Sequence, residues 1–363
     1  MSAERQAQGS GSQALATPAS EQPILQIDHL VKHFPIKAGI IFDKQIGAVQ
    51  AVDDVSFTIE RGETLGLVGE SGCGKSTLAR SILQLIEPTS GSVRFEGREI
   101  TGIRGKESQA LRPQMQMVFQ DPYSSLNPRK RIAQIVGDPM RMHKIVPRSD
   151  VRDAVRDLLE TVGLNPEHYN RFPHEFSGGQ RQRIGVARAL AVNPKLIVCD
   201  EPVSALDVSV QAQILNLLKD LQSTFGLTYI FIAHDLNVVR HISDRVMVMY
   251  LGHGVEIAPK SKLYTAPKHP YTGALLSAVP VPDPEARGKK KVVLEGDVPN
   301  PINPPSACWF HPRCPRFQEG HCDVETPPLY SFSDGQFAAC HYPLEGWPLT
   351  EEEMRRPSSG PVG

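Results

Sequence analysis

Short apolar runs alternate with longer helical patterns from about residue 24 to residue 263. Three of the runs are apolar at nearly every position and only a few residues long: TLGLVGE at 64–70, KLIVCDE at 195–201 and TYIFIAHD at 228–235. Strands that are covered on both faces show this texture, whereas half-exposed strands alternate. The three runs therefore predict buried strands of a parallel sheet.

Two further patterns surround these runs. Residues 151–163 and 210–226 place apolar side chains at helical spacing, and each stretch ends at a glycine, which predicts two amphipathic helices. Residues 25–34 and 49–63 alternate between apolar and polar positions, which predicts exposed antiparallel strands. Together these patterns indicate an α/β fold with a separate antiparallel part.

Beyond Pro267 the pattern of apolar and polar residues changes. Residues 269–280 (HPYTGALLSAVP) predict a short helix, and PDPEARGKKK at 282–291 is a proline-rich, charged linker. Further prolines and four cysteines follow. We expect the linker to separate this C-terminal part from the rest of the chain.

Composition narrows the class of protein. The 363 residues carry a formal net charge of -1 without a block of like charges, so nothing demands a nucleic-acid partner. The apolar runs are too short to span a bilayer, and the polar first 22 residues contain no secretory core, so we expect a disordered N-terminal tail and a cytosolic setting.

The sequence GESGCGKST at 69–77 follows the first predicted buried strand and fits the pattern G-x-x-x-x-G-K-[ST]. Glycines let backbone N–H groups close around a polyphosphate, while the lysine supplies a charge and the serine hydroxyl can bind Mg²⁺. A glycine-rich turn that binds nothing is the alternative. The predicted phosphate-binding residues are Gly69, Ser71, Gly72, Gly74, Lys75, Ser76 and Thr77.

A second candidate is LIVCDEP at 196–202, where a predicted strand ends in two carboxylates. Open α/β sheets bind ligands at this end of their strands. Asp200 suits a role in holding Mg²⁺, and Glu201 suits that of a general base for the attacking water. The alternative is an acidic turn that only faces solvent.

The third element is FSGGQRQRIGVARAL at 176–190, in which a serine and two glycines open a basic helix. This run resembles the signature of ATP-binding-cassette (ABC) ATPases. The resemblance covers residues 24 to about 262. It implies that the following residues serve the nucleotide site: Phe34 as the aromatic that stacks on adenine, Gln120 as a catalytic residue and Mg²⁺ ligand, His234 as a catalytic residue, and Ser177, Gly178, Gly179, Gln180 and Asp207 as nucleotide-binding residues.

The same resemblance implies a P-loop NTPase fold with a RecA-like core, an antiparallel β subdomain and a helical subdomain. We expect the following organisation: a disordered tail at 1–22, an ABC ATPase domain at 23–262 with its helical subdomain at about 121–190, a cysteine-containing C-terminal region at 263–346, and a disordered end at 347–363. In this family the signature of one subunit completes the phosphate site of another, which agrees with one phosphate loop and one signature per chain.

Longer sequence stretches indicate which group of ABC ATPases this chain resembles. The stretches at 117–129, 202–218, 269–280 and 304–315 resemble the ATPases of dipeptide and oligopeptide importers, and the insert at 35–52 is more similar to the F-type than to the D-type subunit. Ala307 departs from this pattern, since a glycine is expected before the first tail cysteine.

The importer resemblance implies an ATP-hydrolysing motor subunit on the cytoplasmic face of the membrane. Its implied partners are two integral membrane permease subunits, a D-type ABC ATPase as heterodimer mate, and indirectly an extracytoplasmic peptide-binding protein, with no nucleic acid. An importer for nickel, glutathione or another small solute is an alternative. A soluble ABC ATPase acting on nucleic acid or ribosomes is a second alternative, from another class.

The tail cysteines Cys308, Cys314, Cys322 and Cys340 follow the spacing C-x₅-C-x₇-C-x₁₇-C. Four thiols in a proline-rich segment with few apolar residues suit a metal site that helps the segment fold. Zinc usually takes closer cysteine pairs, so the spacing favours a larger cluster. The importer resemblance implies a [4Fe–4S] cluster, with a zinc site and four simply packed cysteines as alternatives.

Overall fold

The computed structural model describes residues 22–38, 44–121, 125–278, 294–332 and 335–355. Residues 1–21 of the predicted N-terminal tail, the whole linker at 282–291 and the last eight residues lie outside these ranges, as does the centre of the insert at 35–52.

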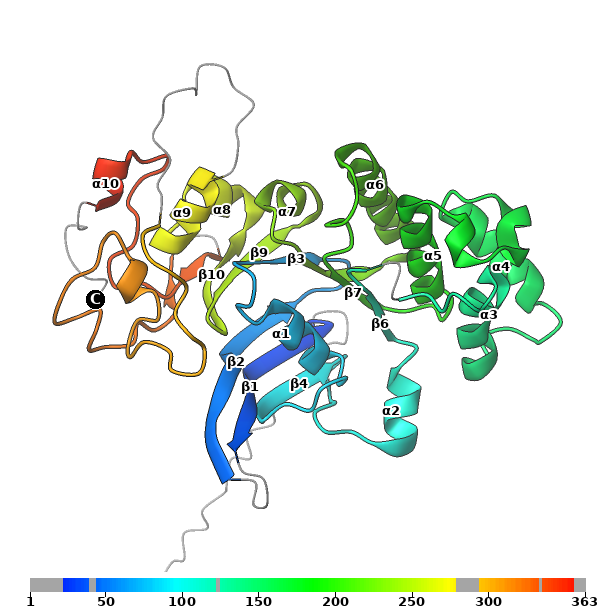
Figure 1. Ribbon diagram of the computed structural model, residues 1–363, viewed down its shortest axis with the longest axis horizontal. Coiled ribbons are helices and arrows are strands. Elements are labelled where there is room, and N and C mark those ends of the chain that lie inside the picture. Colours follow the sequence, from blue (N-terminus) through cyan, green and yellow to red (C-terminus); the bar gives the residue numbers. More distant parts are fainter. Residues whose placement is uncertain (1–21, 39–43, 122–124, 279–293, 333–334, 356–363) are drawn as a thin grey trace, which may run out of the picture.

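The larger of two sheets has eight strands in the order β11-β12-β10-β9-β3-β8-β7-β6 (Figure 1). The five strands from β9 to β6 are parallel, and β10, β12 and β11 continue the sheet in antiparallel pairing. The strand bounds are β3 (Thr64–Val68), β6 (Met115–Val118), β7 (Leu196–Asp200), β8 (Thr228–Ile232), β9 (Arg245–Tyr250), β10 (His253–Pro259), β11 (Tyr330–Ser331) and β12 (Phe337–Ala338). The prediction of three buried parallel strands is therefore confirmed.

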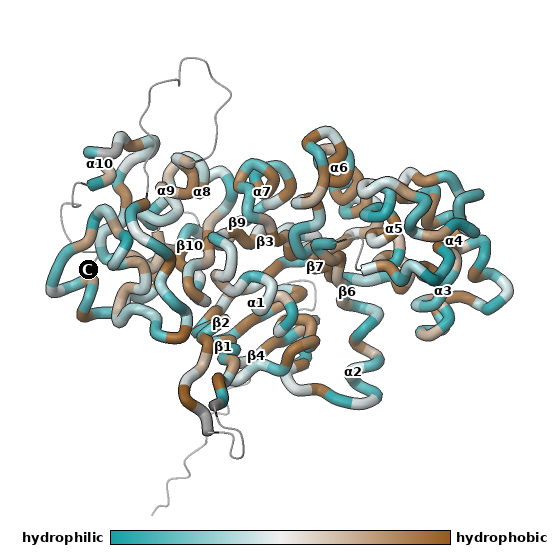
Figure 2. Tube along the Cα trace, in the orientation of Figure 1, coloured by the Kyte–Doolittle hydropathy of each residue, from teal (hydrophilic) through white to brown (hydrophobic). Residues whose placement is uncertain are grey.

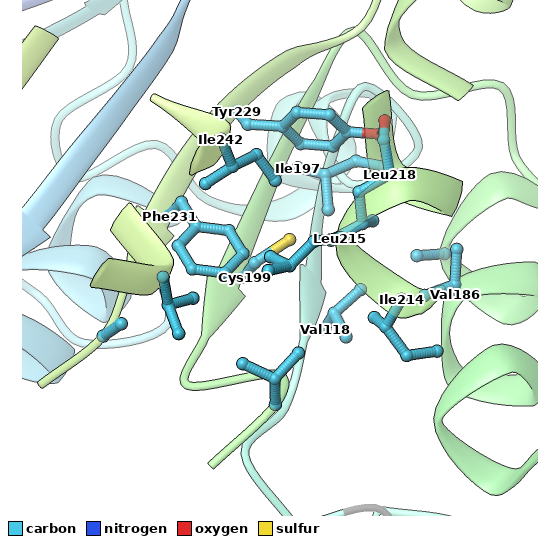
Figure 3. Packing of buried hydrophobic residues seen from close by; sticks show 14 of the residues in the cluster. Val118, Val186, Ile197, Cys199, Ile214, Leu215, Leu218, Tyr229, Phe231 and Ile242 are labelled. Atoms are coloured by element: carbon cyan, nitrogen blue, oxygen red, sulfur yellow. The ribbon is translucent and has the colours of Figure 1, made fainter. Parts of the chain in front are cut away.

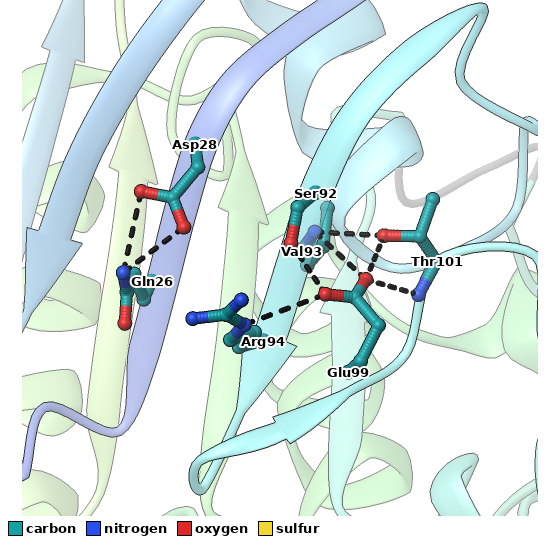
Figure 4. A network of polar contacts seen from close by, with 7 residues as sticks. All are labelled: Gln26, Asp28, Ser92, Val93, Arg94, Glu99 and Thr101. Atoms are coloured by element: carbon teal, nitrogen blue, oxygen red, sulfur yellow. Dashed lines mark hydrogen bonds and ion pairs between the residues drawn. The ribbon is translucent and has the colours of Figure 1, made fainter. Parts of the chain in front are cut away.

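The smaller sheet is antiparallel, in the order β2-β1-β4-β5, as the alternating patterns predict. Its strands are β1 (Leu25–Ala38), β2 (Lys44–Ile59), β4 (Ser90–Phe95) and β5 (Arg98–Glu99). At its edge Glu99 receives hydrogen bonds from Ser92 and Thr101, and Arg94 forms an ion pair with it (Figure 4). These contacts fix the turn between β4 and β5.

Ten α-helices are described: α1 (Lys75–Ile82), α2 (Gly105–Leu111), α3 (Ile132–His143), α4 (Val151–Thr161), α5 (Gly178–Leu190), α6 (Val208–Phe225), α7 (Leu236–Ile242), α8 (Lys260–Thr265), α9 (Pro270–Ala278) and α10 (Glu351–Arg355). Helices α4 and α6 coincide with the predicted amphipathic stretches. The chain between β6 and β7 forms α3, α4 and α5, which lie together on one side of the molecule (Figure 1). In the described part of the chain, no helix combines the length and apolar character that crossing a membrane requires.

Successive side chains of the parallel strands point to opposite faces of the sheet, and both faces are covered by other elements. Ile197 and Phe231 pack with residues of α5, α6 and α7, whereas Val198 and Ile230 pack with α1 and the antiparallel sheet. Figure 3 shows part of the first cluster, and Figure 2 shows the apolar strands at the centre between more polar outer segments. The sheet therefore forms the middle layer, which leaves the ends of its strands free for a site.

The C-terminal region packs against this middle layer. Residues of β12 pair with β10, with Ala338 opposite Glu256, and Cys308 and Phe310 belong to the same buried cluster as the helices α5 to α7. The prediction that the linker separates the C-terminal region from the ATPase domain does not hold for the described residues. Apolar side chains of the C-terminal region, among them Phe310, pack against the buried core of the large sheet. Near the end, where no structure was expected, α10 forms and Met354 is buried against Leu344.

Candidate functional site

The loop at 69–74 joins β3 to α1 and wraps around the amino end of that helix. Gly69 has φ 151° and Gly74 has φ 105°, and a Cβ atom on Gly74 would lie 2.0 Å from the Ala51 carbonyl oxygen. Only glycine fits this conformation and this approach. The loop therefore needs the glycines that the sequence pattern identified.

Lys75 begins α1 and is almost fully buried. Its ammonium group donates hydrogen bonds to the carbonyl oxygens of Gly69, at 2.8 Å, and Glu70, at 3.0 Å. These bonds place a positive charge inside the curve of the loop, where backbone N–H groups and the helix N-terminus also favour an anion.

Ser76 and Asp200 meet beside this lysine. The Ser76 hydroxyl donates to the Asp200 carboxylate at 2.8 Å. Burial raises the pKa of Asp200, while the hydrogen bond from Ser76 and the charge of Arg80 act in the opposite direction. Mg²⁺ is commonly held by one or two protein oxygens together with substrate phosphates and water, so this pair fits such an ion.

Glu201 directly follows β7 with φ 47°, a left-handed conformation that costs a non-glycine residue about 1–2 kcal/mol. Its Oε2 atom accepts a hydrogen bond from Gln120 Nε2 at 3.0 Å and lies 3.3 Å from His234 Nδ1. Its backbone N–H donates to the Ile232 carbonyl oxygen. The carboxylate is therefore held from two sides by side chains that come from neighbouring strand ends.

One open cavity of about 330 Å³ brings most of these residues together. The predicted residues that line it are Ser71, Gly72, Gly74, Lys75, Ser76, Thr77, Gln120, Glu201 and His234. Val49, Ala51 and Pro301 complete the lining and were not identified from the sequence. Pro301 comes from the C-terminal region, and no sequence motif marks it.

The remaining predicted residues lie elsewhere. Phe34 does not line the cavity, but it pairs across β1 and β2 with Val49, which does, and directly paired residues share one face of a sheet. Phe34 is 37% exposed, and the Lys32 ammonium lies 4.9 Å from the centroid of its ring. Its position is compatible with adenine stacking, which stays a prediction.

The signature residues do not line the cavity of their own chain either. Ser177 caps α5, where its hydroxyl accepts a hydrogen bond from Gln180 N–H, and Asp207 caps α6 in the same way through Val210 N–H. A Cβ atom on Gly179 would lie 2.4 Å from a Val210 methyl group, so this glycine also allows α5 and α6 to pack closely.

The prediction of an iron–sulfur, metal-binding site in the tail is contradicted. Among the residues that the structure describes, no group of three or more His, Cys, Asp or Glu side chains is arranged to hold a metal ion. The cavity that Cys308, Cys314, Cys322 and Cys340 line measures about 10 Å³, roughly the space that one water molecule needs. Burial raises the pKa of all four thiols, that of Cys308 to about 11, as is usual for cysteines packed in apolar surroundings.

Comparison with known proteins adds independent information. The family description "ABC transporter" matches residues 52–204, and "Oligopeptide/dipeptide transporter, C-terminal region" matches residues 255–322. A probable peptide ABC transporter ATP-binding protein of Sinorhizobium fredii is 57% identical, with 88% of this chain and 89% of that protein covered. The oligopeptide transport ATP-binding protein OppF of Salmonella typhimurium is 55% identical, with coverage of 80% and 88%.

A solved structure of an ATP-binding cassette is similar to this chain. The ATP-binding cassette MJ0796, in a dimeric post-hydrolysis state bound to ADP and phosphate, aligns with a TM-score of 0.58 at 28% identity. The alignment covers 65% of this chain and 98% of that protein.

Proposed function

Because this chain belongs to the ATP-binding proteins of oligopeptide/dipeptide ABC transporters, we propose that it is the ATP-hydrolysing motor subunit of a peptide importer. The observation that carries the proposal is one cavity lined by a buried lysine, by the Ser76 hydroxyl that is bonded to Asp200, and by a glutamate held by two side chains. A polyphosphate, a divalent cation and an attacking water require this combination.

Each residue has a distinct part in hydrolysis. Lys75 neutralises charge on the outer phosphates, and Ser76, Asp200 and Gln120 would hold Mg²⁺, which supplies further charge stabilisation when bound. Glu201 accepts a proton from the attacking water, while the contacts with Gln120 and His234 keep its carboxylate oriented. Phe34 stacks on the adenine ring.

We further propose that two ATPase subunits complete one another's sites. The residues Ser177, Gly178, Gly179 and Gln180 start a helix whose first N–H groups can bind phosphate, yet they do not line this chain's own cavity. A head-to-tail pair would place them, with Asp207, against the γ-phosphate of the opposite subunit. The mate is either a D-type paralogue or a second copy of this chain.

The family implies membrane permease partners, and we propose that the pair lies beneath two of them on the cytoplasmic face of the membrane. A peptide-binding protein outside the membrane would deliver the substrate. The names of the relatives favour peptides over nickel, glutathione or nucleic-acid targets.

Purification of the tagged chain from detergent-solubilised membranes tests this proposal. We expect two multi-span membrane proteins to co-purify in fixed ratio, together with a second ABC ATPase if the mate is a paralogue, and deletion of the chain to abolish uptake of labelled peptides. Co-purification with ribosomes or nucleic acid, without membrane proteins, would refute it. Loss of nickel or glutathione uptake with normal peptide uptake would leave the motor role and change the cargo.

A further inference from the structure

A side chain of the C-terminal region reaches the phosphate loop. Arg313 ends a short helical turn (His311–Arg313), and its two terminal nitrogens lie 2.7 Å and 3.1 Å from the two carboxylate oxygens of Glu70. The Arg313 side chain is only 7% exposed, against 28% for Glu70. This is a bidentate, charge-assisted pair between segments that are 243 positions apart.

Glu70 is the second residue of the loop that surrounds the candidate phosphate site. Its carbonyl oxygen accepts the hydrogen bond from the Lys75 ammonium at 3.0 Å, and its N–H donates to the Tyr271 hydroxyl at 3.0 Å. Arg313 and α9 therefore hold, through one residue, a part of the loop that itself positions the phosphate-binding lysine.

The arginine sits in a rigid setting. Tyr250, Tyr271 and Phe310 form a cluster of three mutually contacting rings with centroids 4.8 to 5.3 Å apart. The guanidinium lies 5.9 Å from the Tyr250 ring centroid. The hydrogen bond to Glu70 also raises the pKa of Arg313, so the arginine stays charged. A pre-organised guanidinium keeps its partner fixed at little further entropic cost.

A second contact brings the same region to the rim of the cavity. The Gln50 N–H donates to the Pro301 carbonyl oxygen at 3.1 Å, and Pro301 lines the cavity beside Val49 and Ala51. The C-terminal region thus borders the nucleotide site at two places.

The charge balance suggests what the ion pair does. The loop must accommodate a polyanion, and a glutamate within it opposes that task because like charges repel. With Arg313 in place the Glu70 carboxylate is neutralised and turned toward the C-terminal region. Without Arg313, an unpaired negative charge would lie in the loop that has to bind the triphosphate.

We propose that Arg313 is a positioning residue of the nucleotide site, which neutralises Glu70 and makes ATP affinity depend on docking of the C-terminal region. The proposal rests on the phosphate-binding role of the loop proposed above. It assigns the region a part in nucleotide binding.

The test is a double-mutant cycle on the full-length chain. The dissociation constant of a fluorescent ATP analogue is measured for the unvaried chain, Arg313→Gln, Glu70→Gln and the double variant. We expect Arg313→Gln to weaken binding by about tenfold, within the usual range for coupled residues, and Glu70→Gln to leave it nearly unchanged. The double variant should regain most of the lost affinity, since no unpaired carboxylate remains.

Two measurements separate this role from a purely structural one. The weakening in Arg313→Gln should shrink at higher ionic strength, because screening reduces the repulsion by Glu70. Arg316→Gln is the matched control: it removes a buried arginine three positions further along that lines the cysteine cavity and should leave ATP affinity unchanged.

Equal loss of affinity in both single variants and the double variant would overturn the proposal, as would unchanged affinity in Arg313→Gln. If Arg313→Gln does not fold, Arg313→Lys keeps the charge but loses the bidentate geometry, and it should bind ATP with intermediate affinity; wild-type affinity would contradict the positioning role. Failure of the unvaried chain to bind ATP, with no difference from Lys75→Ala, would refute the nucleotide site itself.

Discussion

Replacement of Glu201 by glutamine tests the core of the hydrolytic site. The Glu201 side chain is 19% exposed and is held by Gln120 and His234. A glutamine has the same shape, and its amide oxygen can still accept the hydrogen bond from Gln120 Nε2. The substitution therefore keeps the architecture of the cavity and removes mainly the ability to take a proton from water.

The expected loss follows from that single change. A positioned general base contributes about 10²–10⁴ in rate, which corresponds to roughly 2.7–5.4 kcal/mol of barrier at 1.36 kcal/mol per factor of ten. We expect steady-state ATP turnover by the membrane complex to fall by this factor, while the affinity for ATP stays within about twofold, since Lys75, Ser76 and Asp200 are untouched.

Glu96→Gln is the matched control. Glu96 has a similar side-chain exposure of 24% and pairs with Arg61 and Lys195, away from the cavity. This variant loses a carboxylate and two ion pairs but should retain full turnover. Turnover of Glu201→Gln close to that of the unvaried complex would refute the general-base assignment, and an equal decrease in Glu96→Gln would show that the loss is not specific to the site.

Three further predictions concern adenine binding, backbone strain and pH. Phe34→Ala should raise the KM for ATP by about tenfold with little change in kcat, as expected for loss of stacking; unchanged KM with a lower melting temperature would make Phe34 a packing residue. Ala307 has φ 60°, so Ala307→Gly should raise the free energy of unfolding in urea by about 0.5–1 kcal/mol, the balance of relieved strain and a more flexible unfolded chain. Burial lowers the pKa of His269 from 6.5 to about 3, so the unfolded chain binds more protons between these values and stability should fall as pH decreases below about 6.5. In thermal melts between pH 7 and pH 4, the melting temperature of His269→Gln should depend less on pH than that of the unvaried chain. An equal dependence in both would contradict the lowered pKa of His269.

Sequence patterns alone predicted the glycine-rich loop at 69–77, the two carboxylates after β7 and the buried parallel strands. These features are local, because glycine conformations, strand texture and the order of charged residues are fixed within a few neighbouring positions. The expected α4 and α6 also follow from local periodicity. The importer family pattern has glycine where this chain has Ala307, and that preference also has a local cause, because the backbone at Ala307 is left-handed.

The contacts of the C-terminal region depend on tertiary packing and not on its local sequence pattern. The charged linker suggested separation, and the cysteine spacing suggested a metal cluster, yet the region pairs its strand β12 with β10 and packs its cysteines around a very small cavity. Arg313 carried no signal in the sequence because its partner Glu70 is 243 positions away. Contacts of this kind depend on which surfaces remain open after the core sheet has formed, and local patterns do not encode that choice.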